Sequence, residues 1–248
     1  MKIILIFLIG IAAGFINTLA GGGSLLTVPM LIFLGLPSAV ANGTNRIAVA
    51  VENIVAAANF KNKGYFDMKF GLMIGIPSVI GSILGAKAAI NLPDELFNKI
   101  LGVIMVIVVI FIIWEPQKRL LPSKFELTKT RQAILMILFF FVGIYGGLIQ
   151  GGIGFIIIIV LSLMTDFSLV KINSLKVFVM AMYMLSSLII FIINGKVHWI
   201  LGVTLAMGNG IGGYLGSSFA VKNGDKFVKI ALIIAVIIMA LKLLGVFK

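Results

Sequence analysis

Cysteine is absent from the 248 residues of this chain, and histidine occurs once, at His198. Without cysteine there is no disulfide, no catalytic thiol and no thiolate metal site. The sequence also lacks the Gly-Lys-Ser/Thr ending of a phosphate-binding loop, the G-x-S-x-G nucleophile elbow and a pair of histidines flanking an acid. We therefore predict that the protein is not an enzyme and that it holds neither a metal ion nor a cofactor.

Charged residues are scarce as well. Asp, Glu, Lys and Arg make up 11% of the chain, whereas soluble domains contain about 25%. Hydrophobic residues make up 61%, and apolar runs of about 20 residues recur along the whole sequence. A transmembrane β-barrel is excluded, because its strands would show about ten residues of alternating polarity. The composition predicts an all-α polytopic integral membrane protein.

The few charges are mostly basic, with 20 Lys and Arg against 8 Asp and Glu and a formal net charge of +12. In a soluble protein this excess would suggest nucleic acid as a partner. Here the basic residues lie mostly in short connections between apolar runs, where they set topology and contact anionic lipid. We predict a multi-pass protein of the plasma membrane that contacts membrane lipid and binds no nucleic acid.

Ten apolar helical segments are predicted, five on each side of a charged loop. They cover residues 3–20, 24–35, 38–60, 67–91 and 93–114, and then 132–150, 152–165, 168–194, 197–221 and 225–246. The second segment of each set is short for a span of about 20 residues. If it forms one broken or re-entrant unit with its predecessor, there are eight transmembrane helices and parallel halves. If it crosses alone, there are ten spans and inverted halves.

The two sets of segments match in order and length, which indicates an internal duplication. Asn42 precedes Asn173 by 173 − 42 = 131 residues, and a spacing of 151 − 22 = 129 aligns Gly22 with Gly151. Repeated halves are a common plan of secondary transporters, which bind substrate at the repeat interface. The predicted parts are a first repeat at 1–114, a cytoplasmic linker loop at 115–131 and a second repeat at 132–248.

The first apolar run ends in the motif GFINTLAGGGSLLTVP, residues 14–29. Each of its three glycines disfavours a helix by about 1 kcal/mol relative to Ala, and Ser24 fits the N-cap of a new helix. Lipid cannot satisfy the backbone groups that such a break frees, so the break must face protein or a wet cavity. Close helix packing is the alternative role for the glycines. The substrate-site residues predicted here are Asn17, Gly21, Gly22, Gly23 and Ser24.

The segment at 38–60 carries polar residues that are unusual for a membrane span, namely Asn42, Thr44, Asn45, Arg46 and Glu52. An ionisable residue inside a span is a functional candidate by default. Glu52 lies seven residues after Asn45 and shares its helix face, whereas Arg46 and Glu52 do not share a face. Glu52 either pairs with a base from another helix or carries a proton. Arg46 either faces the site or snorkels to the membrane surface.

The second half offers a matching set of candidates, Gln150, Gly151, Gly152, Asn173 and Lys176. Together with Arg46, Lys176 would supply fixed positive charge, and helices that begin after the glycine breaks would add free N–H groups and partial positive charge. Because Glu52 is the single deep acid, a cation channel lined by carboxylates does not fit. These residue types point to a site for a small anion.

Two segments carry small residues at helical spacing. They are Gly71, Gly75, Gly81 and Gly85 in 67–91, and Gly202, Gly208, Gly212 and Gly216 in 197–221. Small residues let helices approach closely in lipid, where packing rather than water exclusion drives association. We predict that these two helices form the scaffold.

Four of these motifs together resemble the sulfite exporter TauE/SafE family, also called DUF81 or TSUP. They are GFINTLAGGGSLLTVP at 14–29, GIPSVIGSILGAKAA at 75–89, GIYGGLIQGGIGF at 143–155 and GNGIGGYLGSS at 208–218. The second glycine motif departs from the first, because Gln150 replaces Gly21, Ile153 replaces Ser24 and no proline follows. The resemblance implies a plasma-membrane protein of about eight transmembrane helices that transports small sulfur-containing or organic anions such as sulfite and sulfonates.

From residues and resemblance together we predict a secondary transporter whose partners are a small anionic substrate and membrane lipid, with a proton or ion as the coupling partner to be tested. A passive anion channel is the first alternative. A non-transporting membrane enzyme or assembly factor is the second. The choice of anion, the direction of transport and the oligomeric state stay open at this point.

Overall fold

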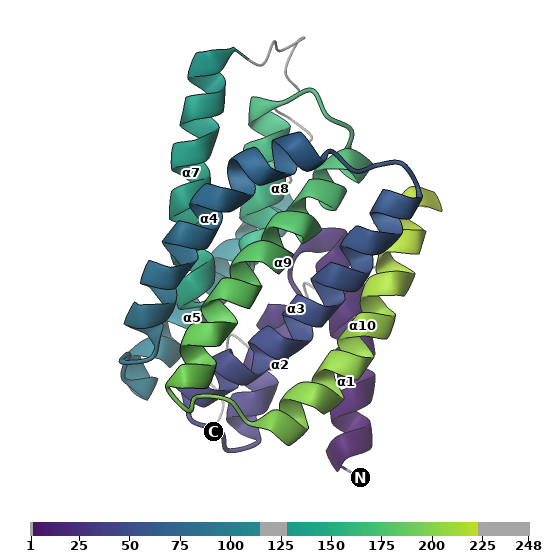
Figure 1. Ribbon diagram of the computed structural model, residues 1–248. Helices are drawn as coiled ribbons and strands as arrows, with labels where there is room; N and C mark the ends of the chain where they lie inside the picture. Colours follow the sequence, from purple (N-terminus) through teal and green to yellow (C-terminus); the bar gives the residue numbers. More distant parts are fainter. Residues whose placement is uncertain (1, 115–127, 223–248) are drawn as a thin grey trace.

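The computed structural model of the protein describes residues 2–114 and 128–222, in which every regular element is an α-helix (Figure 1). The helices are α1 (Lys2–Ala20), α2 (Ser24–Phe33), α3 (Ser38–Asn62), α4 (Met68–Ala89), α5 (Asp94–Trp114), α7 (Lys129–Leu148), α8 (Ile153–Met164), α9 (Leu169–Ile193) and α10 (Trp199–Lys222). Each begins and ends within three residues of its predicted segment, which confirms the all-α fold class. The predicted segment at 225–246 and most of the linker loop lie outside the described residues.

Four of the described helices are long and apolar enough to cross a membrane. Their membrane-capable spans are Ile3–Ala20, Met68–Ala89, Lys129–Leu148 and Leu169–Ile193. The apolar helices α2 and α8, with 10 and 12 residues, are too short to span about 30 Å of hydrocarbon. The protein is therefore embedded in a membrane, with two short helices that need protein around their ends.

The scaffold helices pack through glycine, as the sequence predicts. A Cβ atom at Gly212 of α10 would lie 2.2 Å from the carbonyl oxygen of Ile11 in α1. One at Gly81 of α4 would lie 2.0 Å from the carbonyl oxygen of Phe140 in α7. Backbones this close leave no room for any side chain. The pairs α1–α10 and α4–α7 are thus held by direct backbone contact.

The register of these contacts gives the direction of each helix. Gly208, Gly212 and Gly216 of α10 lie against the carbonyls of residues 7, 11 and 15 of α1, so α1 and α10 are parallel. In the same way, residues 143 and 147 of α7 lie against residues 78 and 82 of α4, so α4 and α7 are parallel. We call the end of the bundle where α3 and α10 begin the lower end, and the end where α4 and α9 begin the upper end, as drawn in Figure 1.

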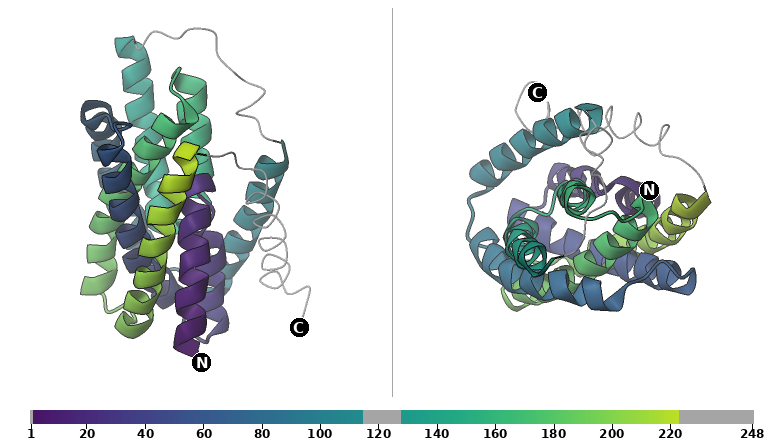
Figure 2. Two further views of the ribbon diagram at one scale, coloured as in Figure 1. Left: turned by 90° about the vertical axis from the view of Figure 1, so that its right-hand side faces the viewer. Right: turned by 90° about the horizontal axis from the view of Figure 1, so that it is seen from above.

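The chain reverses direction at both glycine breaks. The start of α3 lies beside the start of α10, because the amide of His198 donates a hydrogen bond of 2.8 Å to the Thr44 hydroxyl. Helix α1 therefore begins at the lower end, and α2 also finishes there, since four residues separate Phe33 from Ser38. By the same reasoning α7 begins and α8 finishes at the upper end. Figures 1 and 2 show α1 and α7 entering from opposite ends.

These directions bear on the two arrangements that the sequence leaves open. The first arrangement allowed either a broken span or a re-entrant unit. A broken span would need α2 to continue in the direction of α1, which does not fit the reversal, whereas a re-entrant unit turns back as α2 does. The pairs α1–α2 and α7–α8 are hairpins of one long and one short helix, and the two halves have opposite orientations in the bundle. Helices α3 and α9 contact each other, α3 also packs on α10, and α9 packs on α4. If α3 is exchanged for α9 and α10 for α4, this list of helix contacts stays the same, as a duplication would require.

Candidate functional site

The two glycine breaks meet inside the bundle. We call residues 21–23 the first break and residues 149–152 the second break, and all of them are buried. A Cβ atom at Gly21 would lie 2.3 Å from the Cα atom of Gly154, in the first turn of α8. The φ angle of Gly21 is +82°, and those of Gln150 and Gly152 are 58° and 73°. Both reversals thus use left-handed backbone, which glycine adopts without strain.

Lys176 of α9 holds the end of α1 at the first break. Its fully buried ammonium donates hydrogen bonds to the carbonyls of Asn17, at 3.1 Å, and Thr18, at 2.8 Å. Carbonyls in the last turn of a helix have no partner within the helix, and they form the negative end of its dipole. A cation there satisfies the acceptors and the dipole together. Lys176, a candidate cation of the second half, therefore lies at the first break.

Arg46 of α3 holds the end of α7 at the second break. Its two terminal nitrogens donate to the carbonyl of Gly146, at 3.2 Å, and the carbonyl of Gly147, at 2.5 Å. It also donates to the Ser187 hydroxyl at 2.7 Å and lies 4.5 Å from the centre of the Phe191 ring. Arg46 is 0% exposed, so the snorkelling alternative is wrong. The partners are backbone carbonyls of another helix, which keep the guanidinium inside.

Asn42 and Gln150 complete the second break. The Asn42 amide donates to the carbonyl of Leu148 at 2.8 Å, and its oxygen accepts from Arg46 at 3.2 Å. The Gln150 amide donates to the side-chain oxygen of Asn42, at 2.8 Å, and to its carbonyl, at 2.9 Å. Across the loop, the Tyr145 hydroxyl donates to the Gly151 carbonyl. The left-handed backbone at Gln150 is thus held by its own side chain.

Glu52 faces the first break, on a different face of α3 from Arg46. One carboxylate oxygen accepts from the Asn17 amide at 2.7 Å and from the Thr18 hydroxyl at 3.3 Å. The other accepts from the Asn209 amide of α10 at 2.9 Å. Lys176 interacts electrostatically with this carboxylate. The separate faces predicted for Arg46 and Glu52 are confirmed, and each reaches one of the two breaks.

The family model for sulfite exporter TauE/SafE matches residues 6–243, which include both breaks and all of these polar residues. The chain belongs to the TauE/SafE family. It is 25% identical to "Probable membrane transporter protein ORF9" of Sinorhizobium sp., over 97% of this chain and 91% of that one. It is 26% identical to "Probable membrane transporter protein YfcA" of Escherichia coli strain K12, over 96% and 88%. It is 29% identical to "Probable membrane transporter protein YdhB" of Bacillus subtilis strain 168, over 88% of each. No solved structure matches the chain significantly.

Membership of this family identifies a membrane-embedded transporter rather than an enzyme, in agreement with both predictions. Two residues outside the predicted set belong to the polar network at the breaks of this TauE/SafE protein. Thr18 and Asn209 both donate to Glu52. Thr18 directly follows Asn17, and Asn209 is the one amide side chain in the apolar segment 197–221, so both are visible in the sequence as polar residues in apolar runs.

Three other predicted residues have different outcomes. Ser24 is not the N-cap of α2, because the helix begins at Ser24 itself with Gly23 at the N-cap position. The side-chain oxygen of Asn17 accepts from the Gly23 amide at 3.2 Å and serves this end of the helix instead. Thr44 binds the α9–α10 loop at the lower end, away from the breaks. Asn173 is partly buried on α9, close in sequence to Lys176.

Several buried polar atoms have no hydrogen-bond partner among the described residues of this TauE/SafE protein. Those of the predicted set are the Ser24 hydroxyl, both amide atoms of Asn45, the Arg46 Nε atom, and the amide oxygens of Gln150 and Asn173. A buried polar group without a partner costs about 1–3 kcal/mol. Asn45 is 0% exposed, so bulk solvent does not reach its amide atoms. These atoms are free to bind a polar ligand.

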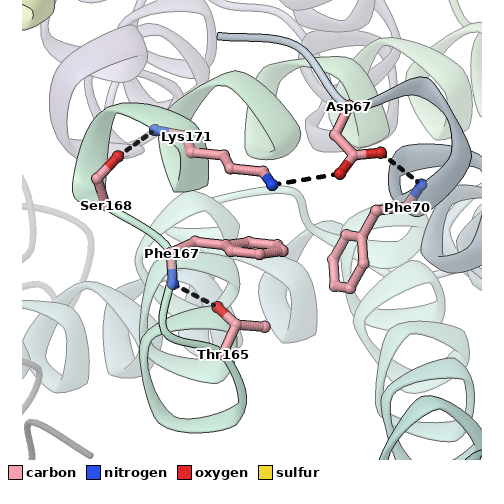
Figure 3. A network of polar contacts seen from close by, with 6 residues as sticks. All are labelled: Asp67, Phe70, Thr165, Phe167, Ser168 and Lys171. Carbon is pink, nitrogen blue, oxygen red and sulfur yellow. Dashed lines mark hydrogen bonds and ion pairs between the residues drawn. The ribbon is translucent and has the colours of Figure 1, made fainter. Parts of the chain in front are cut away.

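A second polar cluster lies at the upper end, between the α3–α4 and α8–α9 connections (Figure 3). The ammonium of Lys171 lies 3.2 Å from a carboxylate oxygen of Asp67 and 3.6 Å from the centre of the Phe167 ring. Asp67 also accepts from the Phe70 amide at 3.0 Å and caps α4. The Phe70 amide and Lys171 lower the pKa of Asp67. A pocket of about 390 Å³ opens beside this ion pair.

Proposed function

We propose that this TauE/SafE protein is a secondary transporter of small anions, sulfur-containing or organic, in the plasma membrane. The observation that carries the proposal is the environment of Arg46. Its guanidinium is fully buried, and its described hydrogen-bond partners are all neutral. A buried ion without a counter-charge costs several kcal/mol. An anion that binds close to Arg46 would provide that counter-charge.

The charge balance around the breaks supports the same proposal. Among the described Asp, Glu, Lys and Arg side chains, Arg46, Lys176 and Glu52 lie at the breaks, and fully ionised they sum to 1 + 1 − 1 = +1. Helices α2 and α8 both begin at the breaks, which lie against each other. Their N-termini add partial positive charge at that point. The centre of the molecule is thus electropositive, as an anion site requires.

The buried donors without a described partner match an oxyanion. Asn45, Ser24 and the Arg46 Nε atom supply donors that have no described partner. A sulfite or sulfonate group presents three oxygens that accept hydrogen bonds, so several donors can bind one ligand. The name of the family, sulfite exporter, agrees with a ligand of this chemistry. We therefore place the substrate between the two breaks, near Asn45.

The mechanism that we propose uses two inverted halves. Substrate at the interface of inverted repeats, near the midplane, is bound by half-helices whose ends line the site, and rocking of one unit against the other gives alternating access. The opposite entry of α1 and α7 supports such a plan. So does the contact between Gly21 and Gly154, because it brings one break from each half to a single point.

Flux measurements on purified protein in liposomes test the proposal. The panel is sulfite, sulfoacetate, methanesulfonate and thiosulfate. Taurine, a zwitterion with no net charge, is the comparison, and each compound is measured with and without a pH gradient. We expect flux of at least one of the four anions above that of taurine, and saturation with concentration. Flux that follows only the electrochemical gradient of the substrate, and never the gradient of a second ion, would identify a passive channel. Monodisperse protein that moves none of the four anions would contradict the proposal.

A further inference from the structure

Glu52 is the only buried acid among the described residues. The other described acids, Asp67, Asp94, Glu95 and Asp166, lie near helix ends and are partly or fully exposed. Glu52 is 0% exposed and sits in the middle of α3, the helix that also carries Arg46. An acid at such a depth is costly to keep without a function. The hydrogen-bond partners and charges around Glu52 show which function its carboxyl group can serve.

The neighbours of Glu52 suit a carboxyl group that changes its protonation state. Its three hydrogen-bond donors, on Asn17, Thr18 and Asn209, are all neutral. The Thr18 hydroxyl both donates and accepts, so it can turn to accept from a protonated carboxyl group. The two amides remain donors to the other lone pairs. The same side chains therefore satisfy both the ionised and the protonated form, with one hydroxyl rotation between them.

The charged groups around Glu52 are few. From α1 and α10 the described side chains that face it are neutral, and from α9 the ammonium of Lys176 interacts with it. That ammonium is also bound to the carbonyls of Asn17 and Thr18. On its own helix, Arg46 faces α7 and α9 instead. Lys176 is thus the one described cation that acts on the carboxylate.

One side chain connects Glu52 to the first break. The amide nitrogen of Asn17 donates to the Glu52 carboxylate at 2.7 Å, and the amide oxygen of Asn17 accepts from the Gly23 amide at 3.2 Å. A charge on Glu52 therefore orients the group that occupies a backbone donor at the start of α2. When the charge is lost, the Asn17 amide still donates to Glu52 but binds it less strongly, so a ligand competes more easily for the Gly23 amide.

We propose that Glu52 binds and releases the coupling proton of this transporter, and that Asn17 transmits the change to the anion site at the first break. The proposal rests on the transport function proposed above. Protonation forms one O–H bond on a carboxylate oxygen and removes one negative charge, so the net charge of the three central ionisable groups rises from +1 to +2. Positive charge favours the anion. The proton and the anion therefore bind together and cross in the same direction.

The test uses full-length protein in liposomes that contain a pH-sensitive dye. The probe is the fastest of sulfoacetate, methanesulfonate and thiosulfate, whose charge stays fixed between pH 6 and 8, so that a pH effect reports on the protein. If sulfite alone moves, it is the probe, with the dye response of protein-free liposomes subtracted. Three quantities are measured: exchange of labelled probe at equal pH, uphill uptake with an acidic exterior, and acidification of the lumen on probe entry.

We expect the wild-type protein to show all three. Glu52→Gln keeps the size and most hydrogen bonds of a protonated glutamate, so exchange should persist while uphill uptake and lumen acidification are lost. Glu52→Asp should restore both. Glu95→Gln is the matched control, because Glu95 is exposed and its partner among the described residues is the exposed Lys99, so its loss should change nothing.

Two outcomes overturn the proposal and leave the transport function intact. One is wild-type uptake of the probe with no proton movement or with movement in the opposite direction, and this result needs no variant to fold. The other is normal uphill uptake by Glu52→Gln. Absence of any exchange in the wild type would instead contradict the transport function itself. The two failures are therefore distinguishable.

Discussion

Arg46 and Lys176 perform the same task at the two glycine breaks, because each binds the last carbonyls of the helix that ends there. Arg46 binds the carbonyls of residues 146 and 147, and Lys176 binds those of residues 17 and 18. These pairs are 146 − 17 = 129 and 147 − 18 = 129 residues apart, the spacing that aligns the glycines. Each cation comes from the half of the chain opposite to the helix it caps. The two halves are therefore locked together at the breaks, whatever else the cations do.

Substitution of Arg46 should separate anion binding from helix capping. We expect Arg46→Gln to raise the KM for the transported anion at least about tenfold, since a hydrogen bond to a charged group contributes about 1.5–3 kcal/mol and 1.4 kcal/mol is tenfold. Lys129→Gln removes an exposed charge from the first turn of α7 and serves as the control. Flux and thermal stability are measured on the same samples. A lowered melting temperature with an unchanged KM would mean that Arg46 only caps α7.

The glycines of the first break can be tested with a matched pair of substitutions. Gly21 and Gly35 have similar φ angles, +82° and +96°, so Ala is strained at both by about 1–2 kcal/mol. A Cβ atom would collide with Gly154 at position 21, but it meets nothing within 4 Å at position 35. Gly21→Ala should therefore destabilise the protein more than Gly35→Ala, by about 1–3 kcal/mol of overpacking.

Thermal unfolding and flux of the two purified variants check this prediction. If Gly21→Ala and Gly35→Ala lose the same stability, residue 21 does not pack against Gly154. The flux per folded molecule adds a second result. If Gly35→Ala transports normally and the folded fraction of Gly21→Ala does not, the first break belongs to the substrate path as well as to the packing.

Helix positions could be read from the sequence because the membrane imposes a simple requirement. A span needs about 20 apolar residues, and glycine clusters interrupt it, so both show directly in the residues. The direction of α2 could not be read in this way, because hydropathy is the same for a helix that continues and one that returns. The register of glycines against backbone carbonyls decides it, and that register exists only between helices distant in sequence.

The candidate site was predicted in part for a related reason. Polar residues in apolar segments are conspicuous, and Arg46, Glu52 and Lys176 all reach the breaks. Their partners are harder to predict, because Arg46 and Lys176 bind backbone carbonyls, which every residue carries. Ser24 was misjudged as an N-cap, since the nearest serine is the usual candidate. The group that serves this helix end belongs to Asn17, six residues before Gly23 and across the break.

The ion pair at the upper end should give a pH-dependent contribution to stability. The pKa of Asp67 is lowered in the folded protein, first by the Phe70 amide and then by Lys171. The ionised form therefore stabilises the fold above the ordinary aspartate pKa of about 3.9, and this contribution is lost as the pH falls through the lowered value. Asp67→Asn keeps the N-cap acceptor and should cost about 0.2–1 kcal/mol at neutral pH.

Melting temperatures of the wild type and Asp67→Asn, measured from neutral pH to below pH 4, check this sign. The difference between them should shrink toward zero as the pH falls. Asp67→Ala also removes the cap of α4, and should cost about 1 kcal/mol more at every pH. A difference between wild type and Asp67→Asn that grows in acid would show that the carboxylate is not stabilising.

The orientation in the membrane follows from where the helices begin and where the basic residues lie. Of the described basic residues outside the centre, seven lie at the upper end, namely Lys61, Lys63, Lys69, Lys129, Arg131, Lys171 and Lys222. Four lie at the lower end, namely Lys2, Lys87, Lys99 and Lys196. Cytoplasmic connections carry the excess of Lys and Arg. The upper end, to which the linker loop also connects, should therefore face the cytoplasm.

Because the chain has no cysteine, one introduced cysteine reports its own side of the membrane without any background. Lys63→Cys lies in the upper α3–α4 connection and Asn194→Cys in the lower α9–α10 connection, and both positions are exposed. With an impermeant maleimide added to intact cells, Asn194→Cys should be labelled at once, and Lys63→Cys only after permeabilisation. Opposite labelling of these two sites is required by the fold, since α3 and α9 run between the two ends. The reverse pattern would keep the fold and invert the orientation, whereas equal labelling of both sites would contradict the chain directions themselves.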